Sequence, residues 1–219
     1  MTLELFAPGH AGGAPVREIA PGAHWLNAFA CPHTDALCND LQNVLEQAPL
    51  RQMQTARGFK MSVAMSNCGM LGWLSDRDGY RYSAHDPLSG RRWPSMPKSF
   101  SMIAQDAAQL AGYRDFVPDT CLINEYGVGA RMSLHQDKNE RQFDAPIVSI
   151  SLGLPAIFLF GGLYRSDPTT KYSLMHGDVV VWGGPSRLRF HGVQPIKPGV
   201  HSSLGARRIN LTFRIAGPL

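Results

Sequence analysis

The second half of the chain, beyond Asp119, is a succession of short strand-like runs with turn residues between them. Each run has the length and the apolar, β-branched composition of a strand, and no helical period separates one run from the next. Seven such runs favour a β-sandwich or a jelly roll over an α/β arrangement. The expected strands are 120–126, 146–152, 156–160, 172–175, 178–182, 187–193 and 208–215.

Two earlier stretches have the 3.6-residue period of a helix instead. Apolar residues recur at helical spacing over 34–47, ending before Pro49, and over 97–111, ending before Gly112. We expect both helices to pack against the β core. Residues 1–24, rich in Gly, Ala and Pro, are expected to form an irregular arm. The chain then divides into an arm with a supporting helix, a middle segment, and a helix with the β core, at residues 1–49, 50–94 and 95–219.

The middle segment is basic and aromatic. Residues 50–98 hold eight basic side chains and three acidic ones, whereas the whole chain has a net charge of only +4. After a strand-like alternation at 61–66 come three glycines, at 69, 72 and 79, with Trp73 between them and Tyr80 and Tyr82 directly after. Arginines between exposed aromatics suit stacking on unpaired bases. The same residues also fit a solvated basic surface over a small satellite core, and the residues alone leave both interpretations open.

Composition leads us to expect a cytoplasmic protein. No run approaches the ~18 consecutive apolar residues of a membrane span, and the first residues lack the basic-then-apolar pattern of a secretory signal. The cysteines show neither C-x-x-C nor zinc-like spacing. We therefore expect four reduced thiols, as is usual in a cytoplasmic protein: Cys31, Cys38, Cys68 and Cys121.

A candidate metal motif is His135-Gln136-Asp137. On an extended strand, residues two apart leave the same face, so His135 and Asp137 can grip one divalent ion. A further histidine would complete the 2-His-1-carboxylate triad of non-haem Fe(II) oxygenases. His191 is the candidate because it lies on a late strand-like run, whereas the other histidines lie in arms or turns. A single histidine on a strand is more often structural, so only its pairing with the motif supports it.

The last run, 208–215, alternates strictly between apolar and polar residues. If this strand lines a barrel, Arg208 and Arg214 point inward, and an unpaired buried charge would cost several kcal/mol. A dicarboxylate such as 2-oxoglutarate would resolve this, since each guanidinium can hold a carboxylate bidentately. Asn124 and Tyr126, two apart on one strand face, could add neutral hydrogen bonds to the same ligand.

These motifs resemble the AlkB family of 2-oxoglutarate- and Fe(II)-dependent dioxygenases, which reverse alkylation damage in nucleic acids. The resemblance covers nearly the whole chain from about residue 25 and implies an orthologue of the bacterial enzyme. It implies an α+β, mainly β fold with a double-stranded β-helix (jelly roll) core, two supporting helices and a β-hairpin nucleotide-recognition lid within 50–94. It is densest at 61–65, 68–73, 134–138, 149–155, 176–184 and 210–214.

The resemblance also implies roles for matching positions. The metal ligands, which are also the catalytic residues, would be His135, Asp137 and His191. The 2-oxoglutarate site would consist of Asn124, Tyr126, Arg208, Asn210 and Arg214. Substrate contacts would be made by Trp73, Tyr80, Tyr82, Asn139, Glu140 and Arg165.

The implied reaction is oxidative demethylation of N-alkylated bases of the 1-methyladenine and 3-methylcytosine type. It requires Fe(II), 2-oxoglutarate and O2, and releases formaldehyde, succinate and CO2. The partner would be single-stranded DNA, because flipping a base from an unpaired strand is cheaper. Alkylated double-stranded DNA and RNA are further candidates, and the protein is expected to act as a monomer without membrane contact.

One departure from the family concerns Asn139, where the bacterial enzyme carries Asp. Asn139 keeps an acceptor oxygen but loses the charge that favours a cationic methylated base, so we expect an altered preference among lesions, with Glu140 nearby as a compensating carboxylate. Two alternatives stay open. A related oxygenase acting on protein or a small molecule would not need the basic aromatic lid. A non-catalytic nucleic-acid-binding module would not need the triad and Arg214 together.

Overall fold

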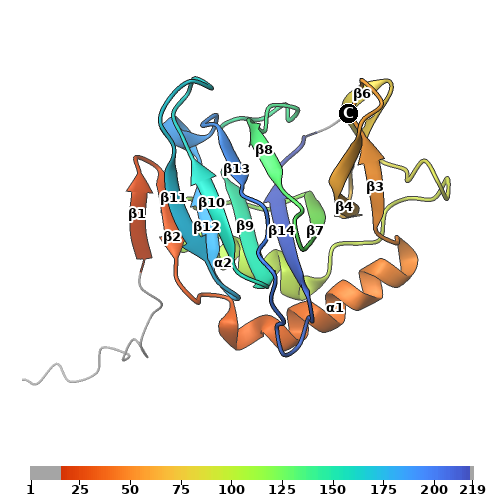
Figure 1. Cartoon of the computed structure of the whole chain (residues 1–219), viewed down its shortest axis with the longest axis horizontal. Coiled ribbons are helices and arrows are strands. Elements are labelled where there is room, and N and C mark those ends of the chain that lie inside the picture. Colours follow the sequence, from red (N-terminus) through yellow and green to blue (C-terminus); the bar gives the residue numbers. More distant parts are fainter. Residues whose placement is uncertain (1–15, 218–219) are drawn as a thin grey trace, which may run out of the picture.

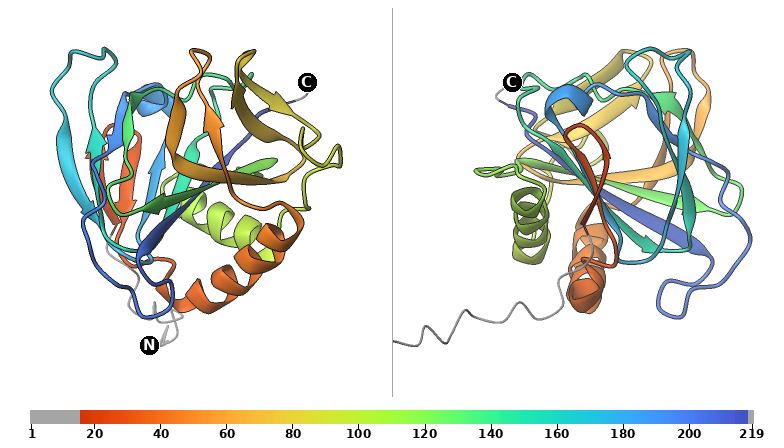
Figure 2. Two further views of the ribbon diagram at one scale, coloured as in Figure 1. Left: turned by 45° about the vertical axis from the view of Figure 1, so that its right-hand side comes forward. Right: turned by 90° about the vertical axis from the view of Figure 1, so that its left-hand side faces the viewer.

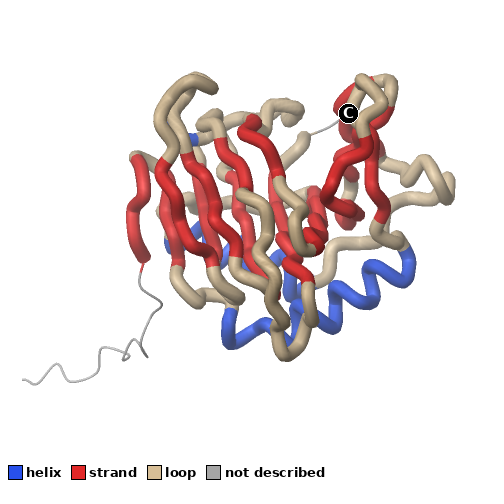
Figure 3. Tube along the Cα trace, viewed as in Figure 1, coloured by secondary structure: helices blue, strands red, loops and turns tan. Residues whose placement is uncertain are grey.

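The computed structural model describes residues 16–217, which form two facing antiparallel sheets with two helices on one side (Figures 1 and 2). The larger sheet has the strand order β1-β2-β12-β9-β14-β7-β4-β3, and the smaller has the order β11-β10-β13-β8. A third, two-stranded sheet is the hairpin β5-β6. This is the expected jelly-roll architecture, and Figure 3 shows how strands dominate it.

The larger sheet is built from β1 (Val16–Ala20), β2 (Ala23–Leu26), β3 (Arg51–Gln54), β4 (Lys60–Gly69), β7 (Thr120–Gly127), β9 (Ile147–Gly153), β12 (Val179–Trp182) and β14 (Arg207–Arg214). The smaller sheet is built from β8 (Met132–His135), β10 (Ala156–Phe160), β11 (Thr170–Leu174) and β13 (His191–Val193). The hairpin consists of β5 (Gly72–Asp76) and β6 (Gly79–Ser83).

Both predicted helices are present, α1 at Thr34–Gln47 and α2 at Lys98–Leu110. Their apolar stripes are buried, including Leu37 and Leu41 on α1 and Phe100 and Ile103 on α2. Helix α2 lies against β9 and β12 and also contacts α1. One core therefore fills the space between the helices and the larger sheet, and a second core lies between the two sheets.

Strand β14 is where the two cores meet. Ile209, Leu211 and Phe213 belong to the helix-side core, as the alternating sequence predicts. The opposite face, with Arg208 and Arg214, is buried as well and turns toward the smaller sheet. The strand is central because it pairs along nearly its whole length with both β7 and β9.

The expected irregular arm is wrong for residues 16–24, where the chain forms the β1-β2 hairpin at the edge of the larger sheet. The turn contains Pro21 and Gly22, a pair typical of tight turns, and Gly22 has a φ of +73° that glycine adopts without strain. Residues 1–15 lie outside the described residues. The expected strand 187–193 is also shorter, because a 3-10 turn, η2 (Gly184–Ser186), precedes it and only His191–Val193 is extended.

The middle segment divides between two sheets. Strands β3 and β4 belong to the larger sheet, where β4 pairs with β7. Only the β5-β6 hairpin stands apart, beside β3 and β4 at one end of the molecule (Figure 1). All four cysteines are free thiols, and neither helix of the described chain has the length and apolar character needed to cross a bilayer.

Candidate active site

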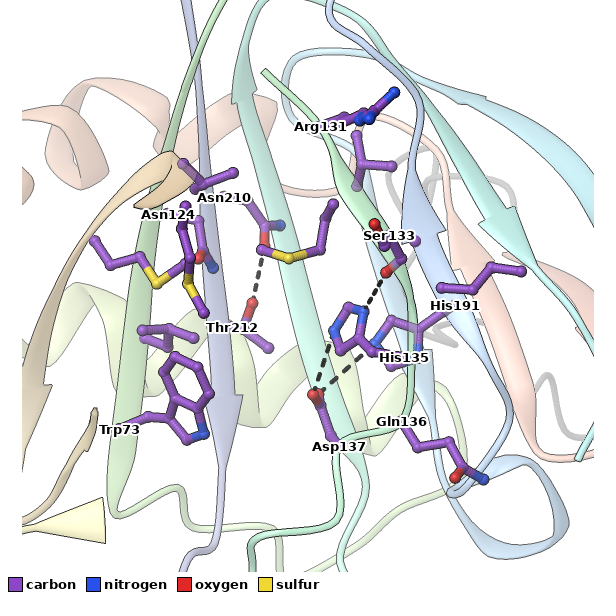
Figure 4. Close-up of a pocket in the computed structure, with 18 of the residues that line it drawn as sticks. Trp73, Asn124, Arg131, Ser133, His135, Gln136, Asp137, His191, Asn210 and Thr212 are labelled. Atoms are coloured by element: carbon purple, nitrogen blue, oxygen red, sulfur yellow. Dashed lines mark hydrogen bonds and ion pairs between the residues drawn. The ribbon is translucent and has the colours of Figure 1, made fainter. Parts of the chain in front are cut away.

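A cavity of about 960 Å³ opens between the two sheets and reaches the β5-β6 hairpin. Figure 4 shows its arrangement: the two histidines and Asp137 lie on one side, Trp73 and Asn124 on the other, and the β14 side chains Asn210 and Thr212 between them. Of the residues predicted to form the site, all but Tyr82 line this cavity.

His135, Asp137 and His191 come together at the cavity wall. His135 ends β8 and lies directly across from His191 in the pairing of β8 with β13. The Nε2 atom of His135 is 3.6 Å from Asp137 Oδ1, and Nε2 of His191 is 3.8 Å from Asp137 Oδ2. The three ligand atoms all lie within 4.8 Å of one another, which suits a single divalent ion.

Each imidazole is oriented by a backbone carbonyl two residues earlier. Nδ1 of His135 lies 2.8 Å from the Ser133 carbonyl oxygen, and Nδ1 of His191 lies 3.0 Å from that of Arg189. An Nδ1 at this distance from a carbonyl oxygen donates a hydrogen bond to it, so Nε2, which faces Asp137, is the ring nitrogen available to a metal. This is how metal-binding histidines are usually held.

The charged groups around Asp137 favour its ionised carboxylate, the form that binds a cation. Burial raises the pKa of Asp137, but Arg214 and the two histidines outweigh it and hold the pKa well below its usual range. Arg214 donates two hydrogen bonds to Asp137 Oδ2, at 3.0 and 2.6 Å, and so leaves Oδ1 for a metal. Burial, with His135 as the next cause, lowers the pKa of His191 to about 4, so its ring is neutral at neutral pH.

The two inward arginines of β14 differ in their partners. Arg214 is paired with Asp137, so it does not lack a counter-charge as the sequence suggested. Arg208 is 1% exposed, and within residues 16–217 it donates only to Ser151 Oγ, while its Nε and Nη1 find no partner there. Burial lowers the pKa of Arg208, although Tyr126 and Asp178 oppose the shift. A buried guanidinium with two unpaired N–H donors is a good binding site for an anion, and a carboxylate can accept both hydrogen bonds.

Neutral groups surround this anion position. Asn124 Oδ1 is buried without a partner, and Tyr126 lies with its ring 5.8 Å from the Arg208 guanidinium. Asn210 is different, because its amide already donates to Ser149 Oγ and to the Ile150 carbonyl, while its Oδ1 accepts from Thr212. Asn210 therefore shapes the pocket wall in this structure.

The hairpin closes the cavity with aromatic rings. Trp73 stacks on Tyr80 with ring centroids 5.6 Å apart and an interplanar angle of 15°. Trp73 Nε1 also donates to Asn139 Oδ1 at 3.3 Å, which joins the hairpin to the segment after the metal motif. On the rim, Arg165 donates to the Leu134 carbonyl at 2.6 Å and lies over the Phe190 ring. These positions suit contacts with a base and its backbone.

Comparison with known proteins identifies the family. Residues 22–214 match the model of the 2OG-Fe(II) oxygenase superfamily. The chain is 54% identical over 215 residues to the α-ketoglutarate-dependent dioxygenase AlkB of Escherichia coli, covering 98% of each chain. The chain belongs to the AlkB family.

More distant members of the AlkB family agree with this assignment. Human nucleic acid dioxygenase ALKBH1 is 29% identical over 128 residues, covering 58% of this chain and 31% of the human one. The structure of OsALKBH1 superposes with a TM-score of 0.80 at 33% identity, covering 92% of this chain and all of that one. As an AlkB-family member, the protein is an Fe(II)- and 2-oxoglutarate-dependent dioxygenase.

Two positions that the AlkB resemblance assigns to substrate contact, Tyr82 and Glu140, are hydrogen-bonded to each other. Tyr82 does not line the cavity, because its hydroxyl donates to Glu140 at 2.6 Å. The Glu140 side chain is only 2% exposed, and both its oxygens have partners in Tyr82, Arg187 and Arg214. Glu140 therefore has no free oxygen with which to replace the missing Asp at Asn139.

Arg187 is the main site residue that sequence reasoning missed. It is buried and donates to the Asp137 backbone carbonyl at 2.8 Å as well as to Glu140. Nothing in its local sequence, Ser186-Arg187-Leu188, distinguishes it from a surface arginine. Arg187 lies in the connection between β12 and β13, and only the tertiary structure places this connection next to the metal motif.

Proposed function

We propose that this protein oxidatively removes alkyl groups from N-alkylated bases, of the 1-methyladenine and 3-methylcytosine type, in single-stranded DNA. The observation that carries the proposal is the cavity itself, which has the His135, Asp137 and His191 cluster at one wall and the stacked Trp73–Tyr80 pair at the other. A flipped base between them would present its alkyl group to the metal. Alkylated RNA and double-stranded DNA are further substrates for the same pocket.

The chain's own residues would prepare this reaction. His135, Asp137 and His191 would hold Fe(II), which with bound 2-oxoglutarate and O2 supplies the oxidant that hydroxylates the alkyl carbon. Arg208 would hold one carboxylate of 2-oxoglutarate through its two free donors, with Asn124, Tyr126, Asn210 and Arg214 around the same ligand. The products would be formaldehyde, succinate, CO2 and the repaired base.

We further propose that β5-β6 is the nucleotide-recognition lid of the segment 50–94. Trp73 and Tyr80 would stack on the base, and Arg165 would contact the substrate or its backbone. Lys60, Arg131 and Lys138 also lie at the cavity. Cationic side chains at the mouth would neutralise phosphates, so binding should weaken as salt rises.

Asn139 is the proposed reason for an altered lesion preference. Its Oδ1 already accepts a hydrogen bond from Trp73, so its NH2 group would face the base. This group is an uncharged hydrogen-bond donor. A cationic base with an exocyclic amine prefers an acceptor and a negative charge. Comparing turnover of 1-methyladenine and 3-methylcytosine oligonucleotides by the protein and by Asn139→Asp tests this, and an unchanged ratio would count against it.

The deciding experiment measures formaldehyde release from a 3-methylcytosine single-stranded oligonucleotide with Fe(II), 2-oxoglutarate and ascorbate. Release should require 2-oxoglutarate and disappear in His135→Ala, but persist in the matched control His33→Ala, whose side chain is exposed and caps nothing. Release of no formaldehyde while 2-oxoglutarate is still consumed would place the substrate elsewhere. Equal DNA binding with and without metal, and no turnover, would favour a binding module.

A further inference from the structure

Glu140 is the centre of a buried polar network that the proposed reaction does not use. Its Oε1 accepts from the Tyr82 hydroxyl at 2.6 Å and lies 3.4 Å from Arg214 Nε, while its Oε2 accepts from Arg187 Nη2 at 3.1 Å. The side chains of Glu140, Arg187 and Arg214 are 2%, 3% and 6% exposed. With Asp137, the network holds two carboxylates and two guanidiniums, so its charges balance.

Arg187 fixes a segment that has no regular structure of its own. Residues 136–146 connect β8 to β9 without helix or strand, and Asp137 is in this connection rather than in β8. Arg187 donates to the carbonyls of Asp137 and Ala145, at 2.8 and 3.1 Å, and its guanidinium lies 5.4 Å from the Phe143 ring centroid. One side chain thus bonds the two ends of the connection.

Tyr82 joins the hairpin to this network. It lies on β6 directly across from Trp73 on β5, so the residue that stacks in the cavity and the residue that bonds Glu140 are cross-strand partners. Burial raises the pKa of Tyr82 well above its usual value, so the hydroxyl stays protonated and donates. Among the described strands the hairpin pairs with no other sheet, so side-chain contacts hold it against the rest of the molecule. The Tyr82–Glu140 hydrogen bond is one of them, beside the bonds that Asn67, Ser75 and Trp93 make.

We propose that Tyr82, Glu140 and Arg187 form a latch, a set of positioning residues that locks the β5-β6 hairpin to the segment carrying Asp137. Closure of the hairpin and correct placement of the Asp137 carboxylate are then one event. By linkage, a divalent ion at the triad stabilises the closed hairpin as much as the closed hairpin strengthens ion binding. The latch rests on the proposed function only in taking Asp137 as a metal ligand.

Amide hydrogen exchange over residues 72–83 tests the hairpin side of the latch. Tyr82→Phe removes only the hydroxyl and should speed exchange of the hairpin amides about tenfold, as expected for the loss of a hydrogen bond to a charged acceptor. Tyr113→Phe is the matched control, since the Tyr113 hydroxyl donates over the same 2.6 Å to the Gly22 carbonyl, far from the hairpin in the fold. Its hairpin exchange should match the wild type.

Mn(II) addition tests the coupling. The metal should slow hairpin exchange in the wild type and slow it less in Tyr82→Phe. Arg187→Lys keeps the charge but replaces the planar guanidinium, whose Nε, Nη1 and Nη2 each reach a different acceptor, with a single ammonium nitrogen. It should weaken Mn(II) binding about tenfold. Arg207→Lys, at an exposed ion pair with Glu125, should not.

The idea is overturned if Tyr82→Phe leaves hairpin exchange unchanged, or if Tyr113→Phe alters it equally. It is also overturned if Mn(II) slows hairpin exchange as much in Tyr82→Phe as in the wild type. Should Arg187→Lys fail to fold, the Tyr82→Phe measurements decide alone. Exchange in the metal-free protein depends on no reaction, so a latch without demethylation and demethylation without a latch remain distinguishable outcomes.

Discussion

Replacing Arg208 with Met should leave the ligand-free protein about as stable as the wild type, or more stable, while strongly weakening its affinity for 2-oxoglutarate. Arg208 is almost fully buried, and its Nε and Nη1 bond nothing among the described residues. The guanidinium makes one hydrogen bond, to Ser151 Oγ at 3.1 Å, and lies against the Tyr126 ring. Met has a similar length and no donors to leave unpaired.

The magnitude follows from these contacts. Each unpaired buried donor costs about 1–3 kcal/mol, so removing two recovers about 2–6 kcal/mol. The lost bond to Ser151 and the lost cation–π contact amount to about 1.5–3 kcal/mol. The free energy of unfolding should therefore change by between about −1 and about +4.5 kcal/mol, so most of the range is a gain in stability. A carboxylate held by two charge-assisted bonds loses about 3–6 kcal/mol, or a factor of about 10²–10⁴ in affinity.

Urea unfolding measures both quantities. The wild type should gain stability when Mn(II) and 2-oxoglutarate are added together, beyond the gain from Mn(II) alone, because ligands that bind only the folded state stabilise it. Arg208→Met should show no gain from 2-oxoglutarate. The neighbouring Arg207→Met, at an exposed ion pair, is the control and should keep the wild-type gain.

Replacing Arg214 with Met should change the stability of the ligand-free protein in the opposite direction. Arg214 donates twice to Asp137, so Arg214→Met leaves a buried carboxylate without its counter-charge and should destabilise the ligand-free protein by about 3–5 kcal/mol. If Arg208→Met is as destabilising as Arg214→Met, or still binds 2-oxoglutarate normally, the proposal that Arg208 binds a carboxylate of 2-oxoglutarate is refuted.

Three further outcomes are expected. Trp73→Ala should lower oligonucleotide affinity by about 1–3 kcal/mol, measured by fluorescence anisotropy, while 2-oxoglutarate affinity is unchanged. Arg131→Ala should weaken binding equally for all sequences and reduce the slope of log affinity against log salt by about 1. Burial raises the pKa of Asp86, but the Leu88 amide and Arg51 outweigh it and lower the pKa overall, so its stabilising contribution is present above about pH 4 and lost as pH falls further. Asp86→Asn should therefore destabilise the protein by about 1–3 kcal/mol at pH 7 and by much less at pH 3, measured by urea unfolding.

Local periodicity determined the parts of the fold that depend on one segment at a time. The apolar spacing predicted α1 without error and α2 to within one residue at each end. Strict alternation sorted β14 into an apolar face and a polar face that carries Arg208 and Arg214, and the jelly roll turned the polar face toward the cavity. The hairpin β1-β2 was missed because its strands are short and interrupted by a Pro-Gly turn, and its edge position needs only weak apolar patterning.

The metal cluster was predictable in part. The spacing of His135 and Asp137 indicated a pair, but the pairing of β8 with β13, which sets His191 across from His135, joins residues 56 positions apart. Asp137 also lies beyond the end of β8, so the strand rule alone does not hold it in place. Arg187 and Arg214 hold Asp137 in place through hydrogen bonds that no local sequence pattern predicts.

By itself, then, the sequence determined the helices, the β-rich class, the two faces of β14 and, through family resemblance, the chemistry. Tertiary structure decided the partners: that Arg214 is neutralised while Arg208 is not, and that Glu140 and Tyr82 bond each other. The physical reason is that burial and hydrogen-bond pairing depend on strand register and on connections between distant segments, whereas periodicity reports only the face that each residue occupies.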